Sequence, residues 1–106
     1  MKSITDEHLR WRIMIGLSTD IDGAPISAQW ARETAIDVAN HFDAFSVTDG
    51  IGFWNGHKEA SLVIERIGPE SDRDAVHTVA ETIARYLNQA EVWVSEEPVV
   101  LTRIVR

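Results

Sequence analysis

The chain has 106 residues, of which 44% are hydrophobic and 25% are charged, and this size and composition fit a single domain over residues 1–106. Its formal net charge is −7, with 10 basic and 17 acidic residues, which disfavours direct binding to a nucleic-acid backbone. Because the chain has no cysteine, disulfides, thiolate metal sites and a cysteine nucleophile are excluded. We expect a cytoplasmic protein with neither a signal peptide nor a membrane-spanning segment.

The first part of the chain predicts a strand, a loop and a helix. Polar residues 1–9 are expected to form a flexible leader. Apolar and polar residues alternate over 10–17, which predicts the first strand. An Asp-, Gly- and Pro-rich loop follows it. Ser27 is then expected to cap a helix over 28–41, because its side-chain oxygen can accept a bond from a free backbone N–H. The apolar stripe of this helix contains Trp30, Ala31, Thr34, Ala35, Val38 and Phe42.

The middle of the chain predicts a β-hairpin. Its strands are expected over 44–54 and 59–67. Asn55-Gly56 joins them, because these residue types readily adopt the positive φ angles of a tight turn. Gly50 and Gly52 are expected to introduce a bulge or a sharp bend into the first strand, with Trp54 packed at the bend.

A second helix and a broken strand are expected after the hairpin. Ser71 is a candidate cap for a helix over 72–88, which has the cleanest apolar stripe in the chain. A short strand over 91–95 is then interrupted by Glu96, Glu97 and Pro98. Residues 99–105 resume the pattern, either as an extension of that strand or as an edge strand.

The element order βαββαβ predicts an α+β ferredoxin-like sandwich, in which two helices cover one face of a four-stranded antiparallel sheet. The other face of such a sheet needs cover. Arg10, Arg12 and Met14 lie on it in the first strand, and Trp54 and Trp93 are candidates for it elsewhere. Since exposed apolar patches mark interfaces, we expect a homodimer.

The most specific pattern in the sequence is F-x-V-x-D-G-x-G-x-W. It is formed by Phe45, Val47, Asp49, Gly50, Gly52 and Trp54. Further shared positions are Gly16, Leu17, Ser18, Ser27, Trp30, Ser61, Val63 and Ile64. Through these residues the span from Gly16 to about Ile104 resembles a family of small bacterial proteins of unknown function. The resemblance implies a ferredoxin-like fold and brings no assigned activity.

Asp49, Trp54, Asn55 and His57 form the candidate pocket or binding set around the hairpin. Ferredoxin-like dimers include cofactor-independent oxygenases that place Trp, Asn and His around an organic substrate, so these residue types allow an enzyme by analogy of fold. A tight turn accounts for Asn55, and packing accounts for Trp54, so neither residue requires a binding site.

Other kinds of site lack their sequence signatures. There is no G-x-S-x-G elbow, and the glycine spacing is not that of a phosphate-binding loop. The run Asp20-Ile21-Asp22-Gly23 is interpreted as a turn rather than as the start of a calcium loop. We therefore predict no catalytic residue, no metal and no cofactor.

These patterns favour a non-enzymatic binding or interaction module that acts as a dimer on a protein partner or a small ligand. Two alternatives stay open. A small oxygenase-like enzyme on a hydrophobic substrate requires a closed apolar pocket on which His57 or Asp49 converges. An acidic inhibitor that mimics nucleic acid requires acidic residues spaced along one surface stripe.

Overall fold

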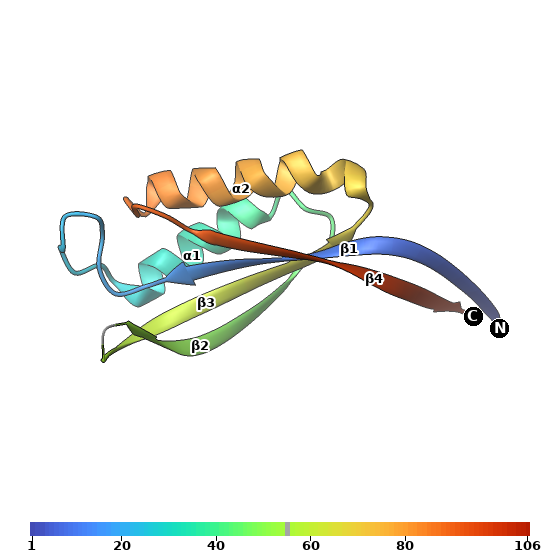
Figure 1. Cartoon of the computed structure of the whole chain (residues 1–106), viewed down its shortest axis with the longest axis horizontal. Helices are drawn as coiled ribbons and strands as arrows, with labels where there is room; N and C mark the ends of the chain where they lie inside the picture. The colour runs from blue at the N-terminus through green and yellow to red at the C-terminus, as the bar shows by residue number, and fades with distance from the viewer. Residues whose placement is uncertain (55) are drawn as a thin grey trace.

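The structure is a computed structural model that describes residues 1–54 and 56–106, apart from the side chain of Trp54. The described residues form β1 (Lys2–Gly16), α1 (Ala28–Ala39), β2 (Ser46–Trp54), β3 (His57–Gly68), a 3-10 helix (Glu70–Asp72), α2 (Arg73–Tyr86) and β4 (Trp93–Val105). Neighbouring strands are antiparallel in the order β2-β3-β1-β4, and α1 and α2 lie on one side of the sheet (Figure 1). The predicted α+β ferredoxin-like architecture is confirmed.

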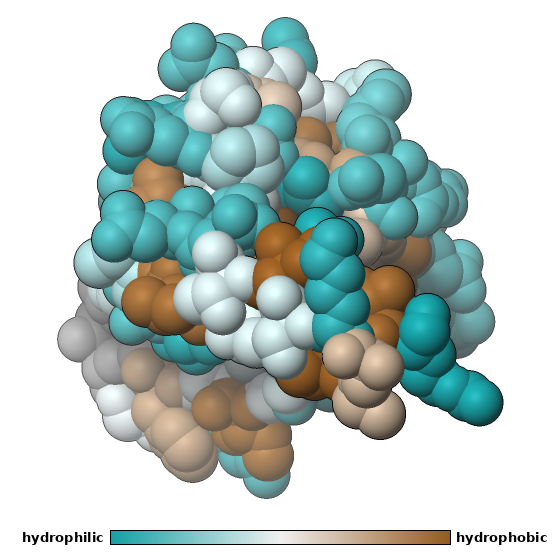
Figure 2. Space-filling model, turned by 90° about the vertical axis from the view of Figure 1, so that its right-hand side faces the viewer, coloured by the Kyte–Doolittle hydropathy of each residue, from teal (hydrophilic) through white to brown (hydrophobic). Residues whose placement is uncertain are grey.

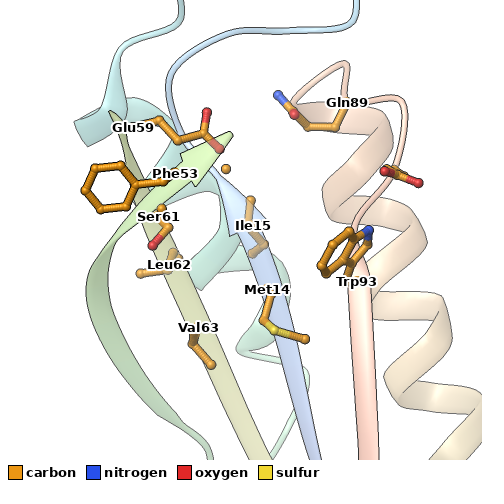
Figure 3. Close-up of a pocket in the computed structure, with 12 residues that line it drawn as sticks. Met14, Ile15, Phe53, Glu59, Ser61, Leu62, Val63, Gln89 and Trp93 are labelled. Atoms are coloured by element: carbon orange, nitrogen blue, oxygen red, sulfur yellow. The ribbon is translucent and has the colours of Figure 1, made fainter. Parts of the chain in front are cut away.

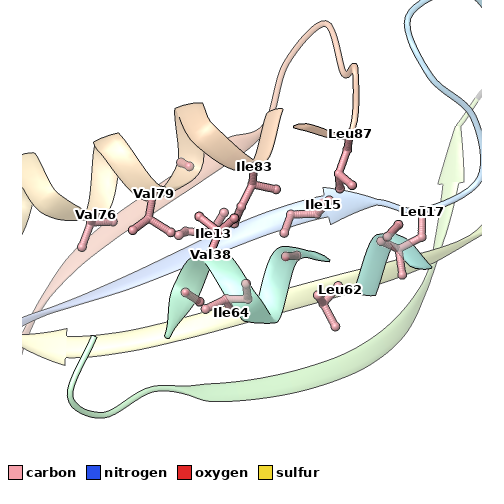
Figure 4. Packing of buried hydrophobic residues seen from close by; sticks show 14 of the residues in the cluster. Ile13, Ile15, Leu17, Val38, Leu62, Ile64, Val76, Val79, Ile83 and Leu87 are labelled. Carbon is pink, nitrogen blue, oxygen red and sulfur yellow. The ribbon is translucent and has the colours of Figure 1, made fainter. Parts of the chain in front are cut away.

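The hydrophobic core lies between the helices and the sheet face beneath them (Figure 4). Because side chains alternate along a strand, β1 turns its predicted apolar face inward, and β3 adds two residues from the same side. The buried hydrophobic side chains of these strands and of the segment after β1 are Trp11, Ile13, Ile15, Leu17, Leu62 and Ile64. Trp30, expected in the apolar stripe of the first helix, is instead 47% exposed, and Tyr86 at the end of α2 is 60% exposed. Alanine and valine supply most of the buried positions of both helices.

The two helices begin in different ways. Ser27 caps α1 as predicted, since its Oγ accepts a hydrogen bond from the backbone N–H of Trp30 at 3.2 Å. The predicted cap at Ser71 is wrong, because Ser71 lies in the 3-10 helix and α2 begins after Asp72. The Asp72 carboxylate makes no capping bond and instead accepts a hydrogen bond from Arg66 at 2.7 Å.

Arg66 of β3 connects three segments on the helix side of the fold. Its guanidinium donates to the carboxylates of Asp43 and Asp72 and to the carbonyl of Ala44, and it lies 5.6 Å from the ring centroid of Phe42. The hydrogen bond from Arg66 lowers the pKa of Asp43. This single side chain therefore joins the α1–β2 connection to the start of α2.

Residues 1–9, expected to be a flexible leader, contain the first half of β1. The β1–β4 pairing runs from Met14↔Trp93 out to Lys2↔Val105, whereas β3 pairs with β1 only from Leu9 onward. The outer parts of β1 and β4 consequently project beyond the sheet as a two-stranded ribbon that ends at both termini (Figure 1). The expected break at Glu96–Pro98 is absent, because β4 is an edge strand, where proline is tolerated.

The expected bulge at Gly50 and Gly52 is also absent. The β2–β3 register is continuous from Ser46↔Glu65 to Trp54↔His57, and neither glycine has a positive φ. The turn glycine Gly56 does have one, at 79°. The turn residue Asn55 lies outside the described residues.

Candidate ligand-binding site

A hollow of about 470 Å³ opens on the sheet face that the helices leave uncovered (Figure 3). It lies over the end of β1, past the Met14↔Trp93 pair where β4 begins. Beyond that pair β1 has no β4 partner, and the segment leading into β4 forms one wall of the hollow. Its volume falls within the ordinary range for sites that bind small molecules.

Glycines keep the floor of this hollow clear. On the helix-free face Gly16 and Gly50 flank Ser61, and Gly52 is paired with Glu59. A Cβ atom added at Gly16 would lie 2.7 Å from Glu59 Oε1, and one added at Gly50 would lie 3.1 Å from Ser61 Oγ. Gly16 and Gly50 therefore leave room for the side chains of Glu59 and Ser61 on β3.

Glu59 is the polar side chain held over this floor. Its Oε2 accepts a hydrogen bond from Ser18 Oγ at 2.6 Å, which fixes the orientation of the carboxylate. Within the described part of the chain, no Lys or Arg forms an ion pair with Glu59 or with Glu91, the second acid of the lining. The hollow therefore presents negative charge to a ligand.

Arg10 and Arg12 of the same sheet face already form ion pairs with glutamates. Arg10 binds Glu97 at 2.9 Å and Glu65 at 3.3 Å, and Arg12 binds Glu65 at 3.2 Å and Glu97 at 3.4 Å. These four side chains form a charge-balanced group farther along β1. Neither arginine lines the hollow.

One exposed aromatic ring stands beside the hollow. Trp93, at the start of β4, lies next to Met14, whereas the ring of Phe53 on β2 points away from the hollow, on the other face from Gly52 (Figure 3). The two aromatic side chains are 57% and 71% exposed. An exposed aromatic ring beside a hollow offers a stacking surface to a flat ligand. The prediction that Trp93 belongs to the helix-free face is confirmed by its pairing with Met14.

The four residues predicted around the hairpin do not form this hollow. Asp49 lies on the helix side of β2, where its Oδ1 accepts a hydrogen bond from Arg32 of α1 at 2.8 Å. His57 is exposed at the start of β3 and does not line the hollow. The side chain of Trp54 and all of Asn55 lie outside the described residues. Sequence reasoning missed Glu59 and Gly16, although the shared alternation of Gly50, Gly52, Glu59 and Ser61 was a usable signal.

A second polar cluster lies on the helix side of the sheet, around Glu96 of β4. Trp11 Nε1 donates to Glu96 Oε1 at 2.7 Å, and Arg73 of α2 donates to both carboxylate oxygens at 2.7 and 3.0 Å. Together these bonds lower the pKa of Glu96 from 4.5 to about 2, and hydrogen bonding from Arg73 has the largest effect. The cluster fastens the middle of β4 to α2 and to the core.

This cluster predicts a loss of stability in acid. A carboxylate whose pKa is lower in the folded chain stabilises it at pH values above the unfolded-state pKa, and this stabilisation is lost as the pH falls from about 4.5 to about 2. In the variant Glu96→Gln, the urea midpoint should change less over this interval than in the parent protein. Asp37→Asn is the matched control and should keep the acid dependence of the parent protein, because Asp37 is an exposed residue of α1 that forms no ion pair within the described residues. An equally steep acid dependence in Glu96→Gln would contradict the assignment.

In the described residues, no group of three or more His, Asp or Glu side chains is arranged to hold a metal ion. Among the same residues, no helix combines the length and the apolar character that crossing a bilayer requires.

Comparisons with solved structures identify the fold. A phage SAM lyase in the apo state has a TM-score of 0.65 at 17% identity, covering 92% of this chain and 89% of that one. A phage SAM lyase in complex with S-methyl-5'-thioadenosine has a TM-score of 0.57 at 16% identity, covering 92% and 90%. CPII, a nitrogen regulatory PII-like protein from Thiomonas intermedia K12 bound to ADP, AMP and bicarbonate, has a TM-score of 0.59 at 11% identity, covering 96% and 100%.

A DUF3240 family protein from Shewanella baltica OS155 is also similar, with a TM-score of 0.60 at 12% identity over 86% of this chain and 89% of that one. Neither a protein-family model nor a curated protein matches the chain. At these identities the similarity shows the shared α+β fold and does not transfer an activity.

Proposed function

We propose that the protein is a small, non-enzymatic module that binds a small ligand in the hollow of its helix-free sheet face and acts as a homodimer in the cytoplasm. The observation that carries this proposal is the glycine-cleared floor, with the oriented carboxylate of Glu59 above it and the exposed ring of Trp93 beside it. Concave sites that combine an apolar lining with a few fixed polar groups are the usual form of ligand sites. The resemblance to the bacterial family of unknown function is compatible with this role.

An adenine nucleoside is the ligand class that we propose to test first. Two of the similar structures hold adenosine compounds, namely S-methyl-5'-thioadenosine in the phage SAM lyase and ADP with AMP in CPII. A purine ring is flat and can stack on Trp93, while its ribose hydroxyls can donate to the carboxylate of Glu59.

Titration of the labelled protein with S-methyl-5'-thioadenosine, followed by amide and indole NMR shifts, tests the proposal. Saturable shifts are expected at Gly16, Gly52 and the indole N–H of Trp93. The indole N–H of Trp30, which lies on α1, should not move and is the internal control. If neither this compound nor AMP shifts the residues of the hollow at millimolar concentration, the proposed ligand class is wrong.

The ribbon of β1 and β4 supports the proposed homodimer. Val100 and Ile104 are 71% and 59% exposed there, and an isolated two-stranded ribbon is marginally stable in water. Figure 2 looks onto the end of the molecule that carries both termini, and it shows brown apolar side chains among teal polar ones. A second copy would cover these side chains and could also pair with an open strand edge.

The double variant Val100→Lys with Ile104→Lys should dissociate the dimer. Val100 is paired with Glu7, so the new lysine gains an opposite charge across the ribbon and the fold of each chain is retained. Light scattering should change from twice the 11.9 kDa mass of one chain to that mass. Ile21→Lys, at a loop residue that is 58% exposed, is the matched control and should stay dimeric. A parent protein that has the mass of one chain at all concentrations would refute the dimer.

Neither alternative function gains support from the geometry. The oxygenase-like alternative requires a closed pocket that His57 or Asp49 enters, and neither residue lines the open hollow. The mimic requires a continuous stripe of acids, whereas Arg10 and Arg12 alternate with glutamates across the helix-free face.

A further inference from the structure

We infer that the hollow selects a positively charged, flat ligand and discriminates against a phosphorylated one. This inference rests on the proposed function, because it concerns the same site, but it specifies the charge of the ligand. It follows from three features of the lining as formed by the described residues, which are acids without an ion-pair partner, no available Lys or Arg, and the exposed ring of Trp93.

The acids of the lining are not neutralised by the described part of the chain. Glu59 is oriented by a neutral donor, Ser18 Oγ, and its carboxylate therefore keeps its charge for a ligand. Glu91 lies in the segment that leads into β4 and also lines the hollow. Both acids line the hollow, so each would attract a cation bound in it, and the attraction is larger in a partly enclosed site than in open water.

The described lining offers a phosphate group no cationic side chain to bind. The lining of the hollow contains no Lys or Arg among the described residues, and Arg10 and Arg12 of the same face are held by Glu65 and Glu97. Binding a phosphate would place its charge near Glu59 and Glu91 inside a chain whose formal net charge is −7. Like-charge placement of this kind is a means by which sites reject a competing ligand.

The exposed ring of Trp93 favours the same ligand class. Trp93 is the side chain best suited to attract a cation to the face of its ring, and it is more than half exposed, so that face is accessible. Met14 lies beside it and contributes a polarisable thioether (Figure 3). A ligand with a flat ring and a positively charged group can therefore contact the Trp93 ring at one side of the hollow and the Glu59 carboxylate over its floor.

Three adenosine compounds that differ in the charge at the 5' position test this inference by calorimetry. The probes are 5'-amino-5'-deoxyadenosine, which is cationic at neutral pH, S-methyl-5'-thioadenosine, which is neutral, and AMP, which is anionic. We expect the affinity to fall in that order, with at least roughly a tenfold difference between the amine and AMP. Added salt should weaken the binding of the amine and strengthen that of AMP, because it screens both charge effects.

Glu59→Gln separates the role of charge from that of shape. Glutamine retains an acceptor for Ser18 Oγ, so the side chain should keep its place over Gly16. The variant should lose roughly tenfold in affinity for the amine and less than about threefold for S-methyl-5'-thioadenosine. Glu33→Gln, at an exposed residue of α1 on the helix side, makes the same charge change elsewhere and should leave both affinities unaltered.

The possible failures are distinguishable. If all three compounds bind with equal affinity, or if AMP binds best, the inference about charge is overturned while the proposed ligand-binding function stands. If none of them binds to the folded protein, both the proposed adenosine class and the inference about charge are overturned. If Glu33→Gln weakens the amine as much as Glu59→Gln does, the effect comes from the overall charge and the assignment to the hollow is wrong.

Discussion

Replacing Trp11 with alanine is expected to lower the free energy of unfolding by about 3–5 kcal/mol, the usual cost of truncating a fully buried large aromatic residue. Trp11 is 0% exposed at the centre of β1, so its removal leaves a cavity between the sheet and α2. The substitution also removes the indole N–H that donates to Glu96, although Arg73 still binds that carboxylate.

The matched control for this variant is Trp30→Ala on α1. Trp30 is 47% exposed, and alanine is the better helix former, so the change should cost less than about 1 kcal/mol. Both free energies should be measured by urea unfolding followed through far-UV circular dichroism, at one protein concentration, since association would make stability depend on concentration. If the two variants lose the same free energy of unfolding, the burial of Trp11 is not the reason for the loss.

Gly52→Val is expected to abolish binding of S-methyl-5'-thioadenosine in the hollow, with at least roughly a tenfold loss of affinity, while the folded chain keeps its stability. A Cβ atom at this position would lie 3.7 Å from Glu59 Cγ, which is ordinary contact, and valine suits an edge strand better than glycine does. The two methyl groups would occupy the hollow itself. A loss of affinity without a loss of stability distinguishes a binding role of this glycine from a structural one.

Gly23→Val provides the contrast to that variant. Gly23 has a φ of 78° in the loop after β1, and nothing lies near the position of an added Cβ atom. A valine there is strained by its backbone conformation and should lower the melting temperature without touching the hollow. If the variant Gly52→Val, in contrast, still binds S-methyl-5'-thioadenosine with the parental affinity, the hollow is not the binding site of that compound.

Much of the fold was predictable because hydrophobic alternation and helical spacing are local signals. The inward face of β1, the cap at Ser27 and the order of the elements all follow from patterns a few residues long. The ribbon was not predictable in this way. Lys2–His8 are mostly polar and become a strand only because Val99–Val105 lie beside them, and that pairing joins the two ends of the chain.

The hollow was not predictable from the sequence for a related reason. Sequence reasoning placed it around the hairpin turn, where Asp49, Trp54, Asn55 and His57 are close along the chain. The hollow instead combines Gly16 of β1 with Glu59 of β3 and Trp93 of β4, which come together only through the sheet order. The two glycines of β2 predict a bend from the sequence alone, since a site that needs open space has the same local glycine pattern as a bulge.

The pairing of the outer parts of β1 and β4 also limits the order in which the fold can form. Thr5 and Thr102 touch across the ribbon through their hydroxyls, and nearly the whole chain separates them. Because β1 is synthesised before β4, the outer half of β1 has no strand partner within its own chain until β4 has been made. Contacts between such distant residues are slow to form, so closure of this ribbon is a natural late step of folding.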